Sequence, residues 1–374
     1  MNDKIQIIIA SVLKPVDDTR SYEKMAQSLV QTSKYEVNII GFESKKILSA
    51  SNIHFHPIFN KERNNKSRLF LPFKILKKYI QLKPKLIIVN TPELLLVTSF
   101  YKIIFGCKFI YDIRENYQWN IHFNKVYKIW QKPFLKFYLW MSEGLSSLLV
   151  DQYFLAEKIY AEQLKFIHKR PYKVIENKTM IKTEGSYPIK LKDKNQLHFV
   201  ISGTLGEEYG TLEGIAFFLE FQKYFPNSDL TVIGYSADQS YRKKIAQHCA
   251  NKSFITLESG DKPIHQESII RALKKADIAI LPYKINKNLQ FRIPTKFYDC
   301  IACHTVMVIP YNPYWIAFLS IYKASFSIDF TKKIPENVYE QILSSSYFGV
   351  TNPKDISWKT EEDKLIDSVF RLFK

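Results

Sequence analysis

Cysteine is scarce in this sequence of 374 residues, which contains only four cysteines together with eight histidines. So few cysteines do not form a disulfide framework in a chain of this length, which favours a reducing compartment such as the cytoplasm. Cys300 and Cys303 make one isolated CxxC pair, whereas a structural metal site needs a second ligand pair at comparable spacing. The sequence therefore predicts no metal site and no redox centre.

Long apolar runs are missing as well. Near the N-terminus only Ile7–Ala10 is continuously apolar, which is shorter than the core of a signal peptide. The most apolar longer stretch, Leu94–Phe105, contains Lys102 and falls short of the ~18 to 20 residues that a membrane-spanning helix requires. We expect a cytoplasmic protein that does not span the membrane.

Acidic residues are outnumbered, since 36 Asp and Glu compare with 54 Lys and Arg, and the formal net charge is +18. This excess favours phosphate-bearing ligands, nucleic acid or an anionic membrane surface, although a lysine-rich proteome would also produce it. No recognisable nucleic-acid motif accompanies the charge, so nucleic acid is not an expected partner. With 46% hydrophobic and 24% charged residues, the chain is expected to be globular.

Short β-branched runs alternate with helical patterns along the chain, which predicts parallel sheets with crossover helices, an α/β fold. The length favours two such domains. We expect a Rossmann-like domain over 1–177, a polar linker region over 178–195 and a second Rossmann-like domain over 196–356. The expected strands are Ile5–Ile9, Val37–Ile40, Leu86–Val89, Phe109–Asp112, Leu197–Ile201, Leu230–Ile233, Phe254–Leu257, Ile278–Leu281 and Val306–Ile309.

The two doubly wound domains are expected to face each other across a cleft, with ligands at the carboxyl ends of the strands. The remaining segment, 357–374, predicts a terminal helix that packs back on the rest of the chain. Its first turn is acidic, and Leu365, Ile366, Val369 and Phe370 follow at helical spacing.

Glycine is the other scarce residue, with 11 in the chain, less than half of the usual frequency of ~7%. Four of the 11 follow the expected strand Leu197–Ile201 and lead into a helix that begins near Thr211. Such a turn presents backbone N–H groups and a helix N-terminus to a phosphate. The alternative is a tight turn that only packs helix against strand, because a Walker lysine and the GxGxxG spacing are both absent. The four glycines are Gly203, Gly206, Gly210 and Gly214.

The segment IPTKFYDCIA, which begins at Ile293, offers the cation that this turn lacks. Its proline and Thr295 suit the first turn of a helix, and Arg292 and Lys296 flank that turn, where they would neutralise a diphosphate. Asp299, one turn further on, would accept hydrogen bonds from both ribose hydroxyls. An ordinary helix start with solvated side chains is the alternative.

This segment resembles the P-x-K-[LF]-[YF]-E-[YF]-x-A motif of the glycosyltransferase family 4 group, which are retaining enzymes of the GT-B fold. Asp299 corresponds to the family glutamate that binds ribose. Gly203 and Gly234 look like the glycines that follow the first two strands of the family's second domain. In the first half, Asp17–Arg20 and Tyr111–Glu115 resemble two further family segments, so the resemblance covers nearly the whole chain.

Several positions depart from the family pattern. The two basic residues that clamp the diphosphate in many members correspond to Thr204 and Tyr209, which are uncharged. Phe291 occupies the position at which the family has the acidic partner of the ribose-binding residue. Arg114 occupies the position of the family's histidine in the first domain. The resemblance then implies that Arg292 and Lys296 replace the lost clamp, with Arg20 or Arg114 assisting from the other domain.

The resemblance implies a glycosyltransferase, for example a hexosyltransferase, that moves a sugar from a nucleotide sugar to a surface glycan such as a capsule, lipopolysaccharide or lipid-linked acceptor. It implies retention and no metal or other cofactor. The alternatives are a catalytically silent GT-B binding or scaffold subunit and a nucleotide-sugar epimerase. The implied catalytic residues are Arg114, Glu115, Arg292 and Lys296. The implied donor-binding residues are Gly203, Thr204, Gly206, Gly234, Arg292, Thr295, Lys296 and Asp299. The implied acceptor-side residues are Asp18, Arg20 and Asn116.

Basic and aromatic residues gather in the first half of the chain. No acidic residue occurs from Asn116 to Ser142, where Lys125, Lys128, Lys132 and Lys136 recur among aromatic residues. A second basic stretch runs from Lys61 to Lys85. The pattern predicts peripheral contact with the anionic inner face of a membrane. The alternative is that the aromatic residues face the core and the lysines are merely solvated. The oligomeric state stays open.

Overall fold

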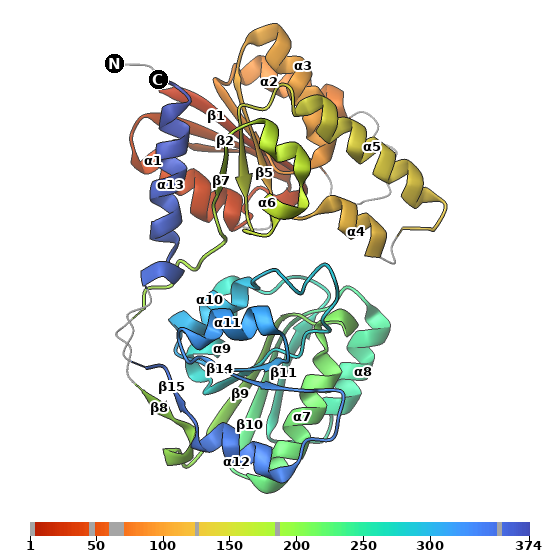
Figure 1. Cartoon of the computed structure of the whole chain (residues 1–374), viewed down its shortest axis with the longest axis vertical. Helices are drawn as coiled ribbons and strands as arrows, with labels where there is room; N and C mark the ends of the chain where they lie inside the picture. The colour runs from red at the N-terminus through yellow and green to blue at the C-terminus, as the bar shows by residue number, and fades with distance from the viewer. Residues whose placement is uncertain (1–3, 45–48, 60–70, 124–126, 184–187, 350–353) are drawn as a thin grey trace. The chain divides into compact units, whose positions relative to one another are not determined.

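The computed structural model describes residues 4–44, 49–59, 71–123, 127–183, 188–349 and 354–374. It divides into two compact units, one formed by Met1–Asn177 with Trp358–Lys374 and the other by Lys178–Ser357. Each unit is a parallel sheet with helices on its faces (Figure 1). No helix of the described part is long and apolar enough to cross a membrane.

Unit 1 contains a seven-stranded sheet in the order β3-β2-β1-β4-β5-β6-β7, and all of its paired strands are parallel. The innermost strands are nearly continuous runs of Ile, Leu and Val because helices cover both of their faces; Leu86–Val89 is buried at every position. The strands are β1 Ile5–Pro15, β2 Tyr35–Phe42, β3 Ile53–Phe59, β4 Leu86–Val89, β5 Lys108–Ile113, β6 Gln152–Leu155 and β7 Tyr172–Val174. The helical segments are η1 Arg20–Ala26, α1 Gln27–Gln31, α2 Leu71–Leu82, η3 Pro92–Leu94, α3 Leu95–Phe105, α4 Tyr117–Phe123, α5 Gln131–Ser146, α6 Tyr160–Gln163, η4 Lys165–Lys169 and α13 Trp358–Arg371.

Unit 2 contains a six-stranded parallel sheet in the order β11-β10-β9-β12-β13-β14, and the small antiparallel pair β15-β8. The strands are β8 Ile189–Lys190, β9 Leu197–Thr204, β10 Ser228–Tyr235, β11 Ile255–Gly260, β12 Ile278–Ile280, β13 Val306–Pro310, β14 Ser325–Ile328 and β15 Ser346–Tyr347. The helical segments are η5 Leu191–Asp193, η6 Glu207–Tyr209, α7 Thr211–Tyr224, α8 Gln239–Cys249, α9 Gln266–Lys275, α10 Thr295–Ala302, α11 Pro313–Ser320, α12 Glu336–Ser344 and η7 Lys354–Ile356.

The C-terminal helix α13 packs back on unit 1, as its acidic first turn and apolar stripe predict. Trp358, Leu365 and Val369 are buried in the same core as β1 and β2. The Trp358 indole N–H donates to Ser28 Oγ at 3.0 Å, and a Glu361 carboxylate oxygen accepts from the Glu176 backbone N–H at 2.9 Å. These contacts connect the end of the chain to the first helices of unit 1 and to the segment that precedes Asn177, where the chain passes into unit 2.

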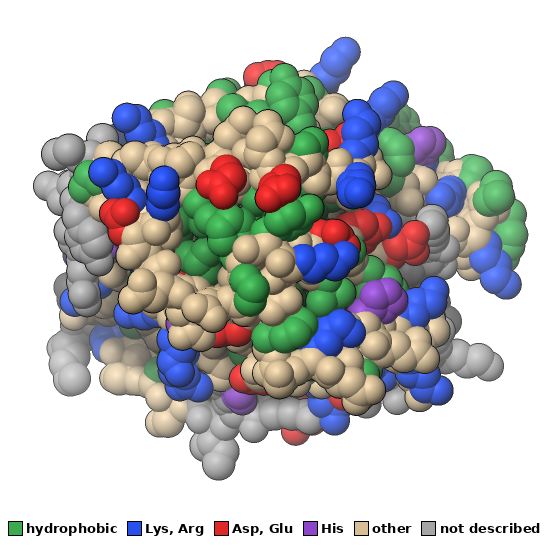
Figure 2. All heavy atoms as spheres, turned by 90° about the horizontal axis from the view of Figure 1, so that it is seen from below, with side chains coloured by type: hydrophobic (Ala, Val, Ile, Leu, Met, Phe, Trp, Pro, Cys, Tyr) green, Lys and Arg blue, Asp and Glu red, His purple; other side chains and the backbone are tan. Residues whose placement is uncertain are grey.

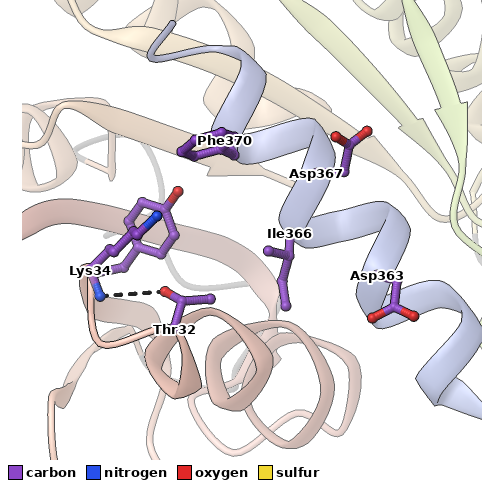
Figure 3. A pocket seen from close by; sticks show the side chains of 7 residues that line it. Thr32, Lys34, Asp363, Ile366, Asp367 and Phe370 are labelled. Atoms are coloured by element: carbon purple, nitrogen blue, oxygen red, sulfur yellow. Dashed lines mark hydrogen bonds between the residues drawn. The ribbon is translucent and has the colours of Figure 1, made fainter.

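A shallow hollow of about 300 Å³ lies between α13 and the turn that precedes β2. Figure 3 shows Phe370, Ile366 and Lys34 around it, with the Lys34 backbone N–H near Thr32 Oγ1. The turn enters the amino end of β2, so the hollow lies at the opposite edge of the sheet from the carboxyl ends of the strands. It is therefore not where an open α/β sheet binds its ligand.

The interval 178–195, expected to be a linker, belongs to unit 2. It includes β8, which pairs with β15, and Thr179, whose backbone N–H donates to the Ile356 carbonyl at 3.1 Å. Residues 184–187 of the interval lie outside the described residues. Six strands were not expected from the sequence, namely β3, β6, β7, β8, β14 and β15, and all of these except β3 are only two to four residues long.

Candidate functional site

Both sheets change winding direction between their first and fourth strands, β1 and β4 in unit 1 and β9 and β12 in unit 2. The chain leaves the sheet to opposite sides at such a switch point, which opens a crevice at the carboxyl ends of the two strands. In unit 2 the residues at this edge are Gly203 and Thr204 from β9 and the segment that follows β12. Most of the sequence-predicted donor residues gather around this edge.

Gly203 and Lys296 are in direct contact there. Gly203 has φ +93°, a backbone conformation that glycine adopts at no steric cost. A Cβ atom at this position would lie 2.7 Å from Cε and 2.9 Å from Nζ of Lys296. The glycine therefore leaves the space that the lysine side chain occupies. Both residues are among those expected from the sequence to bind the donor, and their contact arises from the tertiary fold.

Gly234 brings the neighbouring strand equally close. It pairs with Gly203 in the register of β9 and β10, and a Cβ atom on it would lie 2.0 Å from the Gly203 carbonyl oxygen. A side chain at position 234 would thus push the end of β9 away from β10. The two glycines together fix the end of β9, and the side chain of Lys296 packs against this backbone.

The Lys296 ammonium is held by neutral groups. It donates a hydrogen bond to the Ser202 carbonyl, and its Nζ lies 5.9 Å from the centroid of the Tyr283 ring. Burial lowers the pKa of Lys296 to about 8, against the smaller opposing influence of Cys300 and Asp299. A cation with so little compensating charge would gain from an incoming anion, because bringing a phosphate beside it supplies the missing countercharge.

Asp299, on the next turn of α10, is oriented by a residue that the sequence analysis missed. Thr179 Oγ1 donates to Asp299 Oδ1 at 2.6 Å and accepts from the Ile181 backbone N–H at 3.2 Å. Thr179 is buried, and it lies 120 positions from Asp299 in the sequence. Because this contact depends wholly on the tertiary fold, no local sequence signal announces it.

Arg292 and Thr295 lie at the entrance to α10. Thr295 is the exposed first residue of the helix, and Arg292 is half-buried in the preceding turn. That turn is anchored by α11: the Trp315 indole N–H donates to the Arg292 carbonyl at 2.7 Å, and Asn312 Nδ2 donates to the Gln290 carbonyl at 3.0 Å. The buried Trp315 ring thus fixes the backbone that presents Arg292.

The glycine cluster divides into two kinds of position. A Cβ on Gly210 would lie 1.8 Å from the Pro282 carbonyl oxygen, and one on Gly214 would lie 2.9 Å from Pro282 Cγ. These two glycines let α7 pack on the segment after β12, which is the structural alternative. Gly206 has extended backbone and exchanges hydrogen bonds with Thr211, so this part of the turn is closed upon itself. Only Gly203 of the four contacts a candidate ligand-binding side chain.

A second basic residue, Lys284, lies beside the same turn and was also missed. Its ammonium is 2.8 Å from a Glu213 carboxylate oxygen and 4.0 Å from one of Glu207. The hydrogen bond to Glu213 raises the pKa of Lys284. Lys284 is thus already paired with α7, whereas Lys296 hydrogen-bonds a carbonyl.

In unit 1 the predicted residues Asp18, Arg20 and Arg114 form one ion-pair network with Asp112. Arg20 Nη2 donates to Asp112 Oδ1 at 2.7 Å, and Arg114 bridges Asp112 Oδ2 at 2.9 Å and Asp18 Oδ2 at 2.6 Å. Burial alone would raise the pKa of Asp18, but Arg114 and Lys14 outweigh it and lower that pKa to about 2. Two cations are balanced by two carboxylates, so the network has no net charge to offer a diphosphate.

Glu115 and Asn116 follow this network at the carboxyl end of β5. A Glu115 carboxylate oxygen accepts from Asn120 Nδ2 on α4. Asn116 Oδ1 accepts from the Trp119 backbone N–H at 3.2 Å, and its Nδ2 donates to Gln163 Oε1 at 3.0 Å. Both side chains therefore shape the start of α4.

The polar residue at the switch point of unit 1 is Asn90, which directly follows β4. It is buried, and within the described part of the chain neither its Oδ1 nor its Nδ2 has a hydrogen-bond partner. A buried amide without partners is costly, because both groups lose their bonds to water. Asn90 was not among the residues expected from the sequence, although its position directly after a buried strand was the available signal.

Metal-ligating side chains do not cluster in the parts of the chain that the structure describes, where no group of three or more His, Cys, Asp or Glu is placed to hold an ion. Cys300 is buried and Cys303 partly buried, both have free thiols, and burial raises the pKa of each. Cys300 lies within α10, and Cys303 directly follows its last residue.

Comparison with known proteins gives matches only at the level of structure, because no protein-family model and no curated protein sequence matches the chain. Sucrose-phosphate synthase from Thermosynechococcus elongatus superimposes with a TM-score of 0.65 at 12% identity, over 99% of both chains. The Anabaena protein HepE in complex with UDP and glucose gives 0.62 at 13% identity, over 98% of this chain and 99% of that one. A trehalose-phosphate synthase from Burkholderia vietnamiensis gives 0.62 at 8% identity, over 99% of both. With two parallel α/β units and such neighbours along its full length, the chain has the two-domain GT-B fold.

Proposed function

We propose that this protein is a glycosyltransferase that uses a nucleotide-sugar donor. The observation that supports it most directly is the contact between Gly203 and Lys296 at the switch point of unit 2. Lys296 is half-buried in the first turn of an eight-residue helix, and its ammonium hydrogen-bonds the neutral Ser202 carbonyl, so it is suited to bind a diphosphate. The structural neighbours include HepE with UDP and glucose bound.

In the proposed reaction the donor diphosphate takes the place of the Ser202 carbonyl as the acceptor of the Lys296 hydrogen bond. Arg292 and Thr295 contact the same phosphates from the start of α10. Asp299, oriented by Thr179, accepts hydrogen bonds from the ribose hydroxyls. As the bond between sugar and phosphate breaks, negative charge grows on the departing diphosphate, and Lys296 stabilises that charge.

The sugar is transferred to a hydroxyl of a surface-glycan or lipid-linked acceptor, bound on the side of unit 1, and the proton of that hydroxyl passes to the departing diphosphate. Retention at the sugar carbon is proposed because the α10 motif resembles that of retaining enzymes. Neither step calls for a metal ion, because the leaving-group charge is met by Lys296.

The test is calorimetric titration of the protein with UDP-, GDP-, CDP- and ADP-sugars, followed by donor turnover without acceptor. We expect one nucleotide to bind and its sugar to be slowly hydrolysed. Binding without any turnover, in the presence of candidate acceptors as well, would instead identify a catalytically silent binding subunit of the same fold. If none of the nucleotides binds, the proposal is wrong.

A further inference from the structure

Helix α5 is packed with its polar side inward. Its buried residues are Leu139, Ser142, Glu143 and Ser146, so three of the four are polar. The exposed ones are large and apolar, and Phe134, Phe137 and Trp140 each show more than 60% of their surface to solvent. A surface helix of a globular protein normally has the reverse arrangement. The expectation that the aromatic residues of this segment fill the core, one of the two sequence-based alternatives, is wrong for α5.

Helix α3 packs against α5 and also exposes large apolar residues, although its buried side includes the apolar residues Leu95, Val97 and Tyr101. Phe100, Ile103 and Ile104 lie at the i, i+3 and i+4 positions of one exposed face, and Phe105 continues it. The contact between the helices includes small polar residues, since Ser99 Oγ donates to Ser146 Oγ at 3.0 Å. Small hydroxyl residues between helices, with bulky apolar residues turned outward, are the arrangement found where the surroundings are lipid.

Lys132 and Lys136 of α5 add positive charge beside this surface, and the exposed carboxylate of Glu93 on η3 lies near Tyr138. Lys132 Nζ donates to the His122 carbonyl at 2.8 Å, and Lys136 Nζ lies 3.1 Å from His122 Nδ1, so neither hydrogen bond neutralises the ammonium. The carboxyl group of Glu143 is buried, and burial raises its pKa to about 8, so it adds little negative charge. Figure 2 shows hydrophobic and basic side chains on the part that projects at the right, where the α4–α5 region lies. Lys125 of this region lies outside the described residues.

We propose that the outward faces of α3 and α5 bind the surface of an anionic lipid bilayer. The apolar side chains enter the interface, while Lys132 and Lys136 contact lipid phosphates. The 11 and 16 residues of α3 and α5 are too few to cross the hydrocarbon core, so both helices lie along the surface. A protein partner would more often bury a surface poor in lysine, because interface cores are depleted of this residue.

The test is flotation of the whole protein with two kinds of vesicle at low salt, one of phosphatidylglycerol and phosphatidylethanolamine and one of phosphatidylcholine alone. We expect binding to the anionic vesicles only, and loss of that binding at high salt. Equal binding to both vesicles, or none to either, would overturn the proposal. The assay needs no nucleotide, so its result is independent of the proposed donor site.

The location is tested with a double variant, Phe134→Ser with Trp140→Ser, which we expect to bind anionic vesicles at least about tenfold more weakly. The matched control replaces two equally exposed apolar residues of unit 2, Tyr311→Ser with Ile321→Ser, and should bind like the unmodified protein. Both variants alter exposed side chains, so both should keep their thermal unfolding temperature. Unchanged binding by the first variant places the contact elsewhere and overturns the proposal.

The charge contribution is tested with Lys132→Gln and Lys136→Gln together, which should lower binding to anionic vesicles by about tenfold or more, at ~1 kcal/mol per lysine near the surface. Brominated lipids should quench the fluorescence of Trp140 if the ring enters the bilayer. The protein could instead form dimers through α3 and α5 and not bind vesicles. If the Phe134 and Trp140 replacements then abolish dimerisation, the surface binds a second copy of the chain, and the proposal is overturned.

Discussion

The side chain of Lys296 occupies the space that a side chain at Gly203 would need. A Cβ atom at position 203 would lie 2.7 Å from Cε of Lys296. A strand end and a helix start that are far apart in the sequence thereby form a single site. Lys296 is able to reach the Ser202 carbonyl because position 203 has no side chain. The glycine and the lysine therefore form one functional unit.

Replacing Gly203 with alanine should displace Lys296 as well as strain the backbone. At φ +93° an alanine costs about 1 to 3 kcal/mol, and the new methyl group overlaps the lysine. We expect a lower unfolding temperature and donor binding weakened about tenfold or more, measured by calorimetry. Gly260→Ala is the control, since its nearest neighbour would lie at 3.9 Å and its backbone is ordinary. Equal effects of the two replacements would contradict the assignment.

Replacing Lys296 with methionine keeps the length of the side chain but removes the charge. We expect donor affinity to fall by about 10- to 100-fold, the range of a charge-assisted hydrogen bond. Lys284→Met is the matched control, because Lys284 is already paired with Glu213, and its loss should change donor affinity by less than about threefold. If the two variants lose donor affinity equally, Lys296 has no special role.

The pH dependence of Lys296 gives opposite signs for donor binding and for stability. With a folded-state pKa of about 8 against 10.5, the unfolded chain holds more protons between these values, so stability should rise with pH across that window. Donor affinity should fall over the same window, because the ammonium loses its charge. Chemical denaturation and calorimetry from pH 7 to 10 would show both trends, and Lys296→Met should abolish both.

Thr179 should matter for the nucleoside part of the donor. Thr179→Val removes the hydroxyl that donates to Asp299 at 2.6 Å and leaves a carboxylate oxygen without this partner. We expect about 1 kcal/mol lower stability and several-fold weaker binding of the nucleotide, whereas Thr179→Ser should restore both. Valine and serine variants with the same affinity would show that the hydroxyl does not orient Asp299.

The sequence predicts the sheets of this fold well because their strands are buried on both faces. Leu86–Val89 and Val306–Ile309 are continuous apolar runs, and the structure confirms each to within one residue. Strand β7, with an exposed Tyr172, has no such run and was missed. At the site, the residue types in α10 were informative, but contacts such as Thr179 with Asp299 depend on how the elements pack, which local patterns do not record.

The ion-pair network of unit 1 limits what Arg20 and Arg114 can do. The sequence treats them as free cations, whereas the structure balances them with Asp18 and Asp112. Asp112→Asn should destabilise the protein by about 3 to 5 kcal/mol, since it leaves buried guanidinium groups without their counter-charge. Asp367→Asn, at an exposed pair with Arg371, should cost less than about 0.5 kcal/mol. Urea unfolding compares the two.

The same network predicts sensitivity to acid. The carboxyl pKa values in it are held below their usual range, that of Asp18 at about 2. Their stabilising contribution is complete above the unfolded-state pKa near 4 and is lost as the pH falls from about 4 towards 2. Unfolding measured from pH 6 to 2 should show this loss, and Asp18→Asn should reduce it. An acid transition that is the same in both proteins would assign it to other groups.

Glu143 should give the opposite pH dependence. Burial raises its pKa from 4.5 to about 8, so between these values the folded protein holds a proton that the unfolded chain releases, and stability should fall as the pH rises from about 5 to 8. At about 1.4 kcal/mol per pKa unit, the effect amounts to a few kcal/mol. Glu143→Gln keeps the shape and a hydrogen-bond acceptor for Tyr111, and it should remove the decline and make the variant more stable than the unmodified protein at pH 8. If both proteins lose the same stability between pH 5 and 8, the Glu143 carboxyl is ionised in the folded state and α5 has a buried negative charge after all.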